Sequence, residues 1–297
     1  MRKWLSAAAG IILLALFLYW QNNSIVKTEI DIASGDLPAA FNGYKIIQLS
    51  DLHSKSFGKN QKNILEKVLS SQPDLVVFTG DLVDGKNYDE EPSLLLMKEL
   101  LQIAPVFFVT GNHEWWSGNF QELEKKLLTL GVTVLRNDHV EIEKDNSKMT
   151  IQGIDDPDGG LSAEETMDIT APGTSEGFRI LLAHRPQHFQ LYENHQFDLI
   201  FSGHAHGGQF RLPFVGGIIA PDQGFLPEYD GGRYQSGDSV MIVNRGLGNS
   251  IIPQRLFNRP EIIETTSFLN NLAKSHAAAV RMALCFGKRV SKPGNPV

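Results

Sequence analysis

Five apolar runs, each followed at once by residue types that bind metals, recur in a fixed order along this chain. The runs are rich in β-branched and aromatic residues, as buried strands are; they cover residues 45–49, 75–78, 106–109, 178–182 and 197–201. The polar patches that follow are Asp51-Leu52-His53, Gly80-Asp81-Leu82-Val83-Asp84, Gly111-Asn112-His113-Glu114, His184 and Gly203-His204-Ala205-His206. Open α/β folds gather such strand ends at one edge of a sheet, where their chemistry takes place. The pattern therefore predicts an α/β fold with a two-metal hydrolytic centre.

The composition narrows the classes of function. A chain of 297 residues can bury a large core as one domain or two, and 42% hydrophobic with 21% charged residues is ordinary for a globular protein. The single cysteine, Cys285, lies in the C-terminal tail, which excludes an internal disulfide framework and a thiolate metal cluster. The formal net charge of -7 gives no basic surface for a phosphate backbone, so we expect no nucleic-acid partner.

The N-terminus predicts a membrane anchor. An uncharged stretch, 4–20, follows Arg2 and Lys3 and has tryptophans at both edges, which suits two membrane interfaces. Roughly 17–25 apolar residues span a bilayer, so this stretch lies at the short end. A cleaved signal peptide and a buried globular helix are the alternatives, but no small-residue cleavage site follows the apolar run. The basic flank belongs in the cytoplasm, so we expect a single-pass cell-membrane protein with an extracytoplasmic catalytic domain.

The rest of the chain predicts four segments and several elements. The segments are an anchor at 1–22, a connector at 23–42 with an edge strand at 26–32, a catalytic domain at 43–265 and a basic extension at 266–297 with an amphipathic helix at 268–286. Helices are expected from an N-cap at Asn60, over 94–101 and from Asn119 to Gly131, with a hairpin over 139–143 and 148–153. The acidic stretch 155–177 is expected to be a loop, either solvated or acting as a lid.

Each motif alone is weak evidence for a metal site, whereas the ordered set is strong evidence. Asp51 and His53 share one side of an extended segment, because strand side chains repeat every two residues. His204 and His206 likewise place two imidazoles on one loop face, among small residues that let a ligand approach the backbone. A single motif of this kind also fits an ordinary loop or a hydrogen-bonded histidine. Five in order, each after a predicted strand, favour a metal centre.

The ordered set resembles the calcineurin-like metallophosphoesterase superfamily over residues 45–263. Within it, three runs are similar to a membrane-associated bacterial branch: Gly203-His204-Ala205-His206-Gly207-Gly208-Gln209, Asn244-Arg245-Gly246-Leu247-Gly248 and Arg259-Pro260-Glu261-Ile262. That branch includes phosphodiesterases and a UDP-2,3-diacylglucosamine pyrophosphatase. The resemblance implies an α/β (α+β) fold in which two facing mixed β-sheets form a sandwich flanked by helices, with metals at the strand ends.

The resemblance also implies how the metal ligands divide. One ion would be held by Asp51, His53 and His206, the other by Asn112, His184 and His204, and Asp81 would bridge them. Carboxylate, amide and imidazole ligands without a thiolate suit two divalent ions such as manganese, zinc or iron. Hydroxide held by the ions would attack the phosphorus in line with the leaving oxygen.

Two residues outside the ligand set are implied in catalysis. His113 would protonate or stabilise the leaving oxygen, and Asp84 would hydrogen-bond His113 and raise its pKa. Arg185 and Arg245 fit a phosphate contact and a structural ion pair equally well, so neither is assigned to catalysis.

The sequence leaves the substrate open. The apolar stretch 210–229, interleaved with glycine and proline, fits either a loop packed on the core or a rim that accepts a lipid tail or rests on the bilayer. The leading function is a membrane-anchored dinuclear-metal phosphoesterase that cleaves a phosphodiester or pyrophosphate, with a lipid-linked phosphoester as one option. The alternatives are a UDP-2,3-diacylglucosamine pyrophosphatase of lipid A synthesis, which needs a cytoplasmic catalytic domain, and a non-catalytic metal-binding scaffold.

Overall fold

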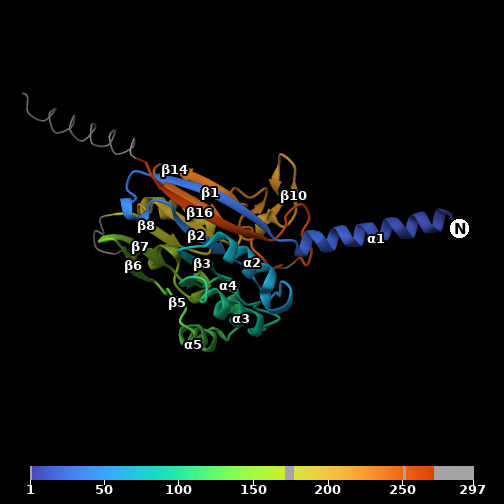
Figure 1. Ribbon diagram of the computed structural model, residues 1–297, viewed down its shortest axis with the longest axis horizontal. Coiled ribbons are helices and arrows are strands. Elements are labelled where there is room, and N and C mark those ends of the chain that lie inside the picture. The colour runs from blue at the N-terminus through green and yellow to red at the C-terminus, as the bar shows by residue number, and fades with distance from the viewer. Residues whose placement is uncertain (1, 171–176, 250–251, 271–297) are drawn as a thin grey trace, which may run out of the picture.

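Two mixed six-stranded sheets face each other in the computed structural model, which describes residues 2–170, 177–249 and 252–270 (Figure 1). The first sheet has the order β1 (Val26–Ser34), β16 (Glu261–Leu269), β2 (Tyr44–Leu49), β3 (Leu75–Thr79), β4 (Val106–Val109) and β5 (Thr133–Val134). The second has the order β14 (Gly232–Ser236), β15 (Ser239–Val243), β9 (Leu199–Ser202), β8 (Arg179–Leu182), β7 (Ser147–Gly153) and β6 (Asp138–Lys144). Strands β2 to β5 run parallel, as do β7, β8, β9 and β15, while the other neighbours include antiparallel pairs. The predicted sandwich is confirmed.

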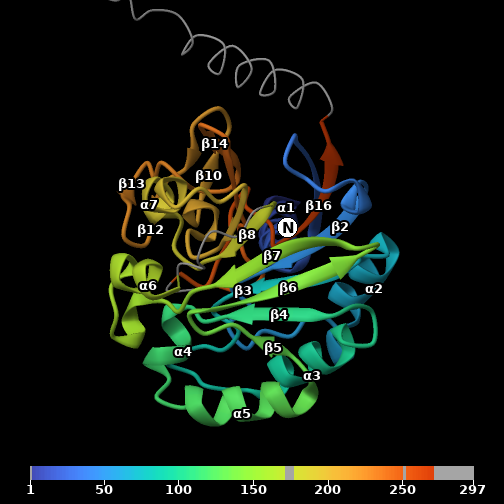
Figure 2. The same ribbon diagram turned by 90° about the vertical axis from the view of Figure 1, so that its left-hand side faces the viewer.

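The central strands are buried on both faces. In β2, Ile46 packs into the core between the two sheets, and its neighbour Ile47 packs into the core on the outer face. Helices α2 (Lys62–Ser71), α3 (Glu91–Leu100) and α5 (Phe120–Leu130) cover that outer face. Helices α6 (Ala163–Thr170) and α7 (Phe189–Asn194) cover the second sheet on the opposite side (Figure 2). This two-sided burial explains why the runs read as continuous apolar segments.

Most predicted elements are present. All five apolar runs form strands whose ends lie within two residues of the expected positions, and the expected edge strand is β1. The hairpin of β6 and β7 turns at Asp145 and Asn146, both at positive φ, as a two-residue hairpin turn requires. Helix α5 begins after Asn119 and ends at Gly131, whose φ is 102°.

Four expectations need correction. Asn60 caps no helix: it lies at φ 55° inside the short helix η2 (Lys59–Gln61). Helix α2 begins only at Lys62, because Gln61 before it is also left-handed, at φ 59°, which a right-handed helix cannot include. The acidic stretch 155–177 is more than a loop, because it contains η3 (Pro157–Gly159) and α6. Strand β16 continues to Leu269, four residues past the expected end of the domain. The helix expected at 268–286 does not begin there, because Phe268 and Leu269 belong to β16. Its residues 271–286, and residues 171–176, lie outside the described residues.

Helix α1 (Arg2–Asn23) projects from one end of the sandwich (Figure 1). Its segment Lys3–Asn23 is long and apolar enough to cross a membrane, with a mean hydropathy of 1.7, and 6% of its apolar window is buried. Two small hairpins follow β9 near the same end: β10 (Arg211–Leu212) with β11 (Gly216–Gly217), and β12 (Ile219–Ala220) with β13 (Gly224–Phe225). The remaining short elements are η1 (Ala39–Phe41), α4 (Asn112–Trp116), η4 (Pro186–His188) and η5 (His206–Gly208).

Candidate metal centre

The predicted ligands lie directly after strands of both sheets. Asp51 follows β2, Asp81 follows β3, Asn112 follows β4, His184 follows β8, and His204 and His206 follow β9. The structure brings six of the seven predicted ligands into two clusters, in each of which one potential ligand atom per residue lies within 4.8 Å of the others. The sandwich therefore joins motifs from two different sheets at one site.

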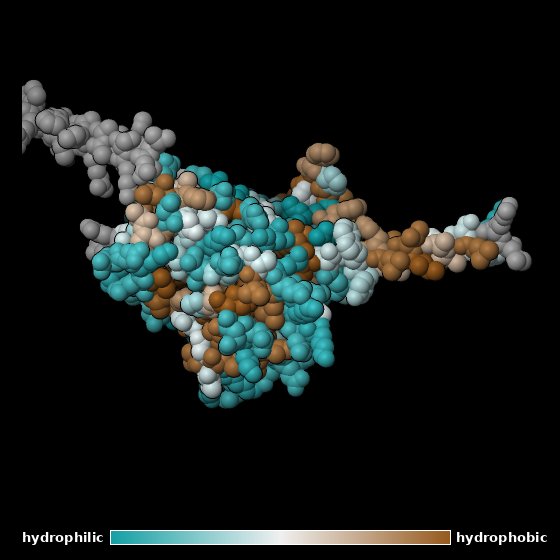
Figure 3. Space-filling model, in the orientation of Figure 1, coloured by the Kyte–Doolittle hydropathy of each residue, from teal (hydrophilic) through white to brown (hydrophobic). Residues whose placement is uncertain are grey.

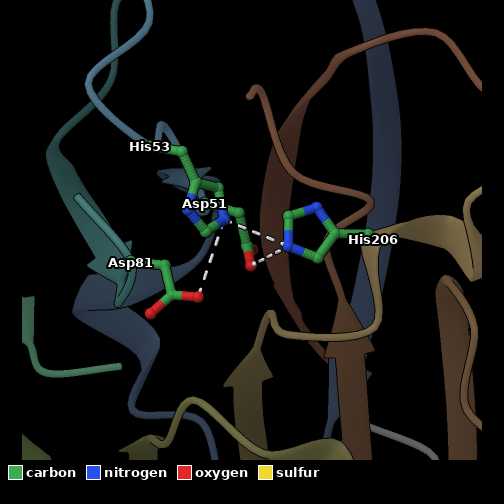
Figure 4. A group of neighbouring side chains, drawn as sticks. All are labelled: Asp51, His53, Asp81 and His206. Atoms are coloured by element: carbon green, nitrogen blue, oxygen red, sulfur yellow. Dashed lines mark hydrogen bonds and ion pairs between the residues drawn. The ribbon is translucent and has the colours of Figure 1, made fainter. Parts of the chain in front are cut away.

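The first cluster consists of Asp51, His53, Asp81 and His206, all buried (Figure 4). The Nε2 atoms of His53 and His206 are 3.1 Å apart, and His206 Nε2 lies 3.2 Å from Asp51 Oδ1. His53 Nε2 also lies 3.6 Å from Asp81 Oδ2. Two imidazole nitrogens and two carboxylate oxygens thus point at one small volume.

The second cluster shares an atom with the first. Asp81 Oδ2 lies 3.3 Å from His184 Nε2, and His184 Nε2 lies 3.1 Å from His204 Nδ1. The same Oδ2 therefore faces histidines of both clusters. A carboxylate oxygen in that position is suited to lie between two cations.

The histidines of the second cluster present lone pairs to each other. His184 Nδ1 lies 2.7 Å from the carbonyl oxygen of Thr79, so it carries the proton and donates it there. His204 Nε2 lies 2.8 Å from Asp222 Oδ2 and donates in the same way. When both rings are neutral, as imidazoles that bind a metal are, the facing atoms His184 Nε2 and His204 Nδ1 each present a lone pair across 3.1 Å. A cation between them resolves this contact, so the residues fit a metal ion.

Asn112 gives a second indication of fit. Its side chain is buried, and its Oδ1 has no hydrogen-bond partner among the residues that the structure describes. A buried amide oxygen without a partner is unfavourable, and metal coordination is one way to satisfy it. The unpaired oxygen matches the ligand role expected of Asn112.

Burial and mutual charge shift the pKa values of the ligands strongly. Burial raises the pKa of Asp51 to about 7 and lowers that of His53 to about 3. Burial also holds the pKa of His206 well below its usual value. Burial also opposes the charged forms of Asp81 and His184, which meet where the two clusters join. The attraction between their opposite charges outweighs burial, so the pKa of Asp81 falls and that of His184 rises to about 10. A bound cation would favour the ionised carboxylates and the neutral imidazoles together.

Five of the seven predicted ligands have a left-handed backbone. The φ angles are 52° at Asp51, 48° at His53, 54° at Asp81, 64° at His204 and 48° at His206. Each such residue costs about 1–3 kcal/mol and persists only where its surroundings hold it. The strain turns the chain sharply at each strand end, so that closely spaced side chains reach one centre.

Glu114 is a residue of this site that sequence reasoning missed. Its fully buried carboxylate accepts hydrogen bonds from the backbone N–H groups of Asp81, Leu82 and Gly111 at 2.8, 2.8 and 2.6 Å. It thereby ties the turn after β3 to the turn after β4. The only sequence signal was its place directly after His113, which does not reveal a partner some thirty residues earlier.

His113 lies beside the first cluster with a defined tautomer. Its Nδ1 accepts a hydrogen bond of 2.9 Å from the N–H of Gly85, so the ring proton is on Nε2. The expected hydrogen bond from Asp84 is not among the contacts of the described residues. The Asp84 carboxylate lies in a group with His53 and His113, and it accepts from the N–H groups of Lys86 and Asn87 instead. The Gly85 amide occupies Nδ1 of His113, which leaves Nε2 as the ring nitrogen open to another partner.

The two uncertain arginines form ion pairs. Arg185 contacts Asp156 through Nε at 2.7 Å and Asp222 through Nη1 at 2.7 Å, and Arg245 contacts Glu261 at 2.6 Å. Each guanidinium is thus engaged by carboxylates of the protein. Asp222 was missed as a site residue, although it joins Arg185 to the ring of a predicted ligand.

The family model described as calcineurin-like phosphoesterase matches residues 44–208, the segment that carries all seven predicted ligands. The chain belongs to this family and is a phosphoester hydrolase with the family's α/β sandwich. It is 35% identical to the uncharacterized metallophosphoesterase YkuE of Bacillus subtilis, over 82% of this chain and 86% of that protein.

Two further relatives bear on membrane attachment and reaction type. A Danio rerio protein named transmembrane protein with metallophosphoesterase domain is 28% identical over 82% of this chain, which spans 56% of that relative. Phosphodiesterase YaeI of Escherichia coli is 30% identical over 74% of this chain and 80% of its own length.

Proposed function

We propose that this protein is a membrane-anchored phosphoesterase that uses two divalent metal ions to hydrolyse a phosphodiester or a pyrophosphate. The observation that carries the proposal is the position of Asp81 Oδ2, which faces His53 of one cluster and His184 of the other. A single-metal site or a structural histidine cluster would not need one buried carboxylate oxygen shared in this way.

The ligand roles follow the two clusters. Asp51, His53 and His206 would hold one ion, Asn112, His184 and His204 the other, and Asp81 both. Two ions held by these residues would supply charge that stabilises the attacking and leaving oxygens of an in-line displacement. Manganese, zinc and iron all suit this mixture of oxygen and nitrogen ligands.

His113 is proposed to act on the leaving group. Its Nδ1 is occupied by Gly85 N–H, so Nε2–H is the atom that can donate a proton or a hydrogen bond. The ring stacks edge-on against the ring of His53, with centroids 4.4 Å apart, which keeps it beside the metal cluster. Asp84 belongs to the same group of side chains as His53 and His113, and is proposed to act beside His113 on the substrate.

Membrane anchoring by α1 is the second part of the proposal. The helix is apolar, almost wholly unburied and flanked by basic residues at its N-terminus. Arg2 and Lys3 favour a cytoplasmic N-terminus and an extracytoplasmic catalytic domain. A transmembrane relative with the same catalytic domain is consistent with attachment.

The test of the metal assignment is Asp81→Asn in the purified full-length protein. The amide keeps the size of the side chain but removes the shared charge, so turnover of an aryl phosphodiester should fall to background and the bound manganese should fall below two ions per chain. Asp138→Asn on the exposed edge strand is the matched control. Near-native turnover with full metal content in Asp81→Asn would show that the assignment is wrong.

A lipid-linked substrate is the finer proposal. The wild-type enzyme should hydrolyse a long-chain lipid phosphodiester with a higher kcat/KM than a short-chain ester of the same headgroup, mainly through KM, because remote apolar binding is uniform between ground and transition states. Equal kcat/KM values for the two chain lengths would reject a lipid moiety and leave the metal assignment untouched.

A further inference from the structure

Two small hairpins expose a concentrated set of large apolar side chains. The residues and their exposed fractions are Leu212 48%, Phe214 109%, Val215 57%, Phe225 78% and Leu226 65%. We call these five residues the apolar ridge. Figure 3 shows a hydrophobic projection at the end of the molecule that carries α1. An exposed apolar group of this size on a soluble surface marks an interaction site.

The apolar ridge is continuous with the base of α1. Phe210, at the start of the first hairpin, pairs with Leu256, and the Arg211 N–H donates to the Leu256 carbonyl oxygen at 3.0 Å. The next residue, Phe257, is half exposed and packs against Phe17 of α1, with ring centroids 6.0 Å apart. An apolar path therefore runs from the helix to the first hairpin.

The contact with Phe17 shows how far along α1 this apolar path lies. Phe17 lies six residues before the end of α1, which is about 9 Å at the helical rise of 1.5 Å per residue. Near the same level, the Arg259 guanidinium lies 4.6 Å from the Trp20 ring, and tryptophan with arginine is a typical pair for a membrane interface. If α1 crosses a bilayer, the surface at Phe257 meets the interfacial layer.

We propose that the apolar ridge inserts into the interfacial layer of the bilayer that α1 crosses, and so forms a second membrane contact. The inference rests on the proposed anchoring by α1. A bilayer is the occupant that fits, because it already surrounds the helix to which the ridge is joined through Phe257. One helix would leave the body free to tilt, whereas two contacts fix which face of the body lies on the lipid.

The second contact would hold the metal centre close to the lipid surface. Asp222 lies in the turn between β12 and β13, only three residues before Phe225, and its carboxylate bonds His204 at 2.8 Å. Gly208, two residues after His206, packs so closely on Gly217 that a Cβ there would lie 2.3 Å from the Gly217 Cα. The hairpins that carry the ridge are thus attached directly to the ligand loops. Phosphoesters at the level of lipid headgroups are the substrates this position favours.

Site-directed fluorescence tests the contact in the full-length protein. Phe214→Cys in a Cys285→Ser background would be labelled with an environment-sensitive nitrobenzoxadiazole probe and reconstituted into vesicles of phosphatidylethanolamine and phosphatidylglycerol. We expect a blue shift of the emission and its loss when lipids carry a doxyl quencher near the headgroup. Leu128→Cys, on the exposed face of α5 away from α1, is the matched control and should show neither effect.

The possible results distinguish lipid contact by the apolar ridge from membrane anchoring by α1 and from coverage of the ridge by a second copy of the chain. If the vesicles retain the protein but the probe at position 214 behaves like the probe at 128, the ridge does not touch lipid and the inference is overturned. A blue shift that persists in dilute detergent and resists doxyl quenching would also overturn it, since a second copy of the chain would then cover the ridge. Failure of the protein to float with vesicles would reject the anchoring itself.

The double variant Phe214→Ser with Phe225→Ser gives an independent check. It should keep the wild-type kcat for a small aryl phosphodiester in detergent, because both side chains are largely exposed whereas the predicted ligands are buried. A probe at Leu226→Cys in this variant should lose the doxyl quenching that the same probe shows in the parent protein. Unchanged quenching would contradict insertion through the ridge.

Discussion

His113 offers the clearest separation of catalysis from metal binding. Its Nδ1 accepts from Gly85, and its backbone N–H donates to Asp81 Oδ1 at 2.8 Å, so the ring is oriented by groups that a side-chain truncation leaves in place. We expect His113→Ala to slow turnover by about 10²–10⁴-fold, the usual contribution of general acid–base catalysis, with both ions retained. Steady-state kinetics with metal analysis on the same sample measures this.

The leaving group provides the internal control for that variant. A nitrophenyl ester expels an oxygen that needs no proton and should be affected much less than an alkyl ester. His139→Ala, on the exposed edge strand β6, should change neither reaction. Loss of an ion in His113→Ala would overturn the assigned role.

Asp222 is predicted to control the affinity of the second ion. It accepts from His204 Nε2 and so fixes the tautomer that leaves Nδ1 free for a metal. Removing such a partner typically lowers metal affinity about 10–100-fold, and we expect Asp222→Ala to weaken one of two manganese sites by that range. Manganese titration followed by electron paramagnetic resonance measures both sites.

Asp158→Ala is the matched control for Asp222. Asp158 also pairs with Arg185, through Nη2 at 3.0 Å, but contacts no predicted ligand in the described part of the chain. If both variants weaken metal binding equally, the effect comes from Arg185 and not from the histidine.

At the scale of elements, the end of α1 is hydrogen-bonded to a loop that supports the first cluster. Asn22 donates through Nδ2 to the Pro253 carbonyl oxygen at 2.9 Å and accepts through Oδ1 from the Arg255 N–H at 2.8 Å. The buried Arg255 side chain donates to the Gly248 carbonyl oxygen at 3.0 Å, and the Gly248 N–H donates to that of Asp51 at 2.6 Å. Helix α1 is therefore linked to the loop that carries Asp51 by consecutive hydrogen bonds.

Asn22→Ala should consequently weaken the ion held by Asp51, His53 and His206. Two hydrogen bonds are lost, each of which contributes about 0.5–1.5 kcal/mol. If half of that free energy is lost from manganese binding at the first cluster, the affinity for this ion falls several-fold. Excess manganese should restore kcat, which a folding defect would not allow. Asn23→Ala is the control, because Asn23 Nδ2 donates its hydrogen bond to the Tyr19 carbonyl oxygen within α1 itself. Equal manganese affinity in the two variants would disprove the link.

At the scale of the whole molecule, the N-terminal charges predict on which side of the membrane the catalytic body lies. Arg2 and Lys3 precede α1, so a C-terminal alkaline phosphatase fusion should be active and a C-terminal green fluorescent protein fusion dark when exported. A bright fluorescent fusion with inactive phosphatase would place the body in the cytoplasm and favour the lipid A pyrophosphatase alternative.

The sequence by itself determined the strands and the motifs that follow them. Each signal is local: β3 is an apolar run, and Asp81 comes two residues after its end, so neighbouring residues alone carry the prediction. Convergence within each sheet also followed, since parallel strands end at a common edge. The meeting of the motifs after β2, β3 and β4 with those after β8 and β9 did not follow, because these strands belong to two sheets that the sandwich brings together. The left-handed turn at Asp81 did not follow, because a non-glycine residue at positive φ is stabilised by its surroundings and not by its own preference.

Only the tertiary structure decided which groups complete the site. Glu114 binds the turn after β3, and Asp222 reaches His204 from a hairpin eighteen residues later, so their roles depend on chain segments that meet only after folding. The helix in the acidic stretch was missed although the sequence carries a local signal for it: Ser162 and Glu165 form a capping box, in which each side chain accepts a hydrogen bond from the backbone N–H of the other. Met167 of α6 then packs into a core formed with β8 and β9. Strand patterns depend on sequence neighbours, whereas hydrogen-bond partners and apolar contacts depend on distances in space, and these are set by the whole fold.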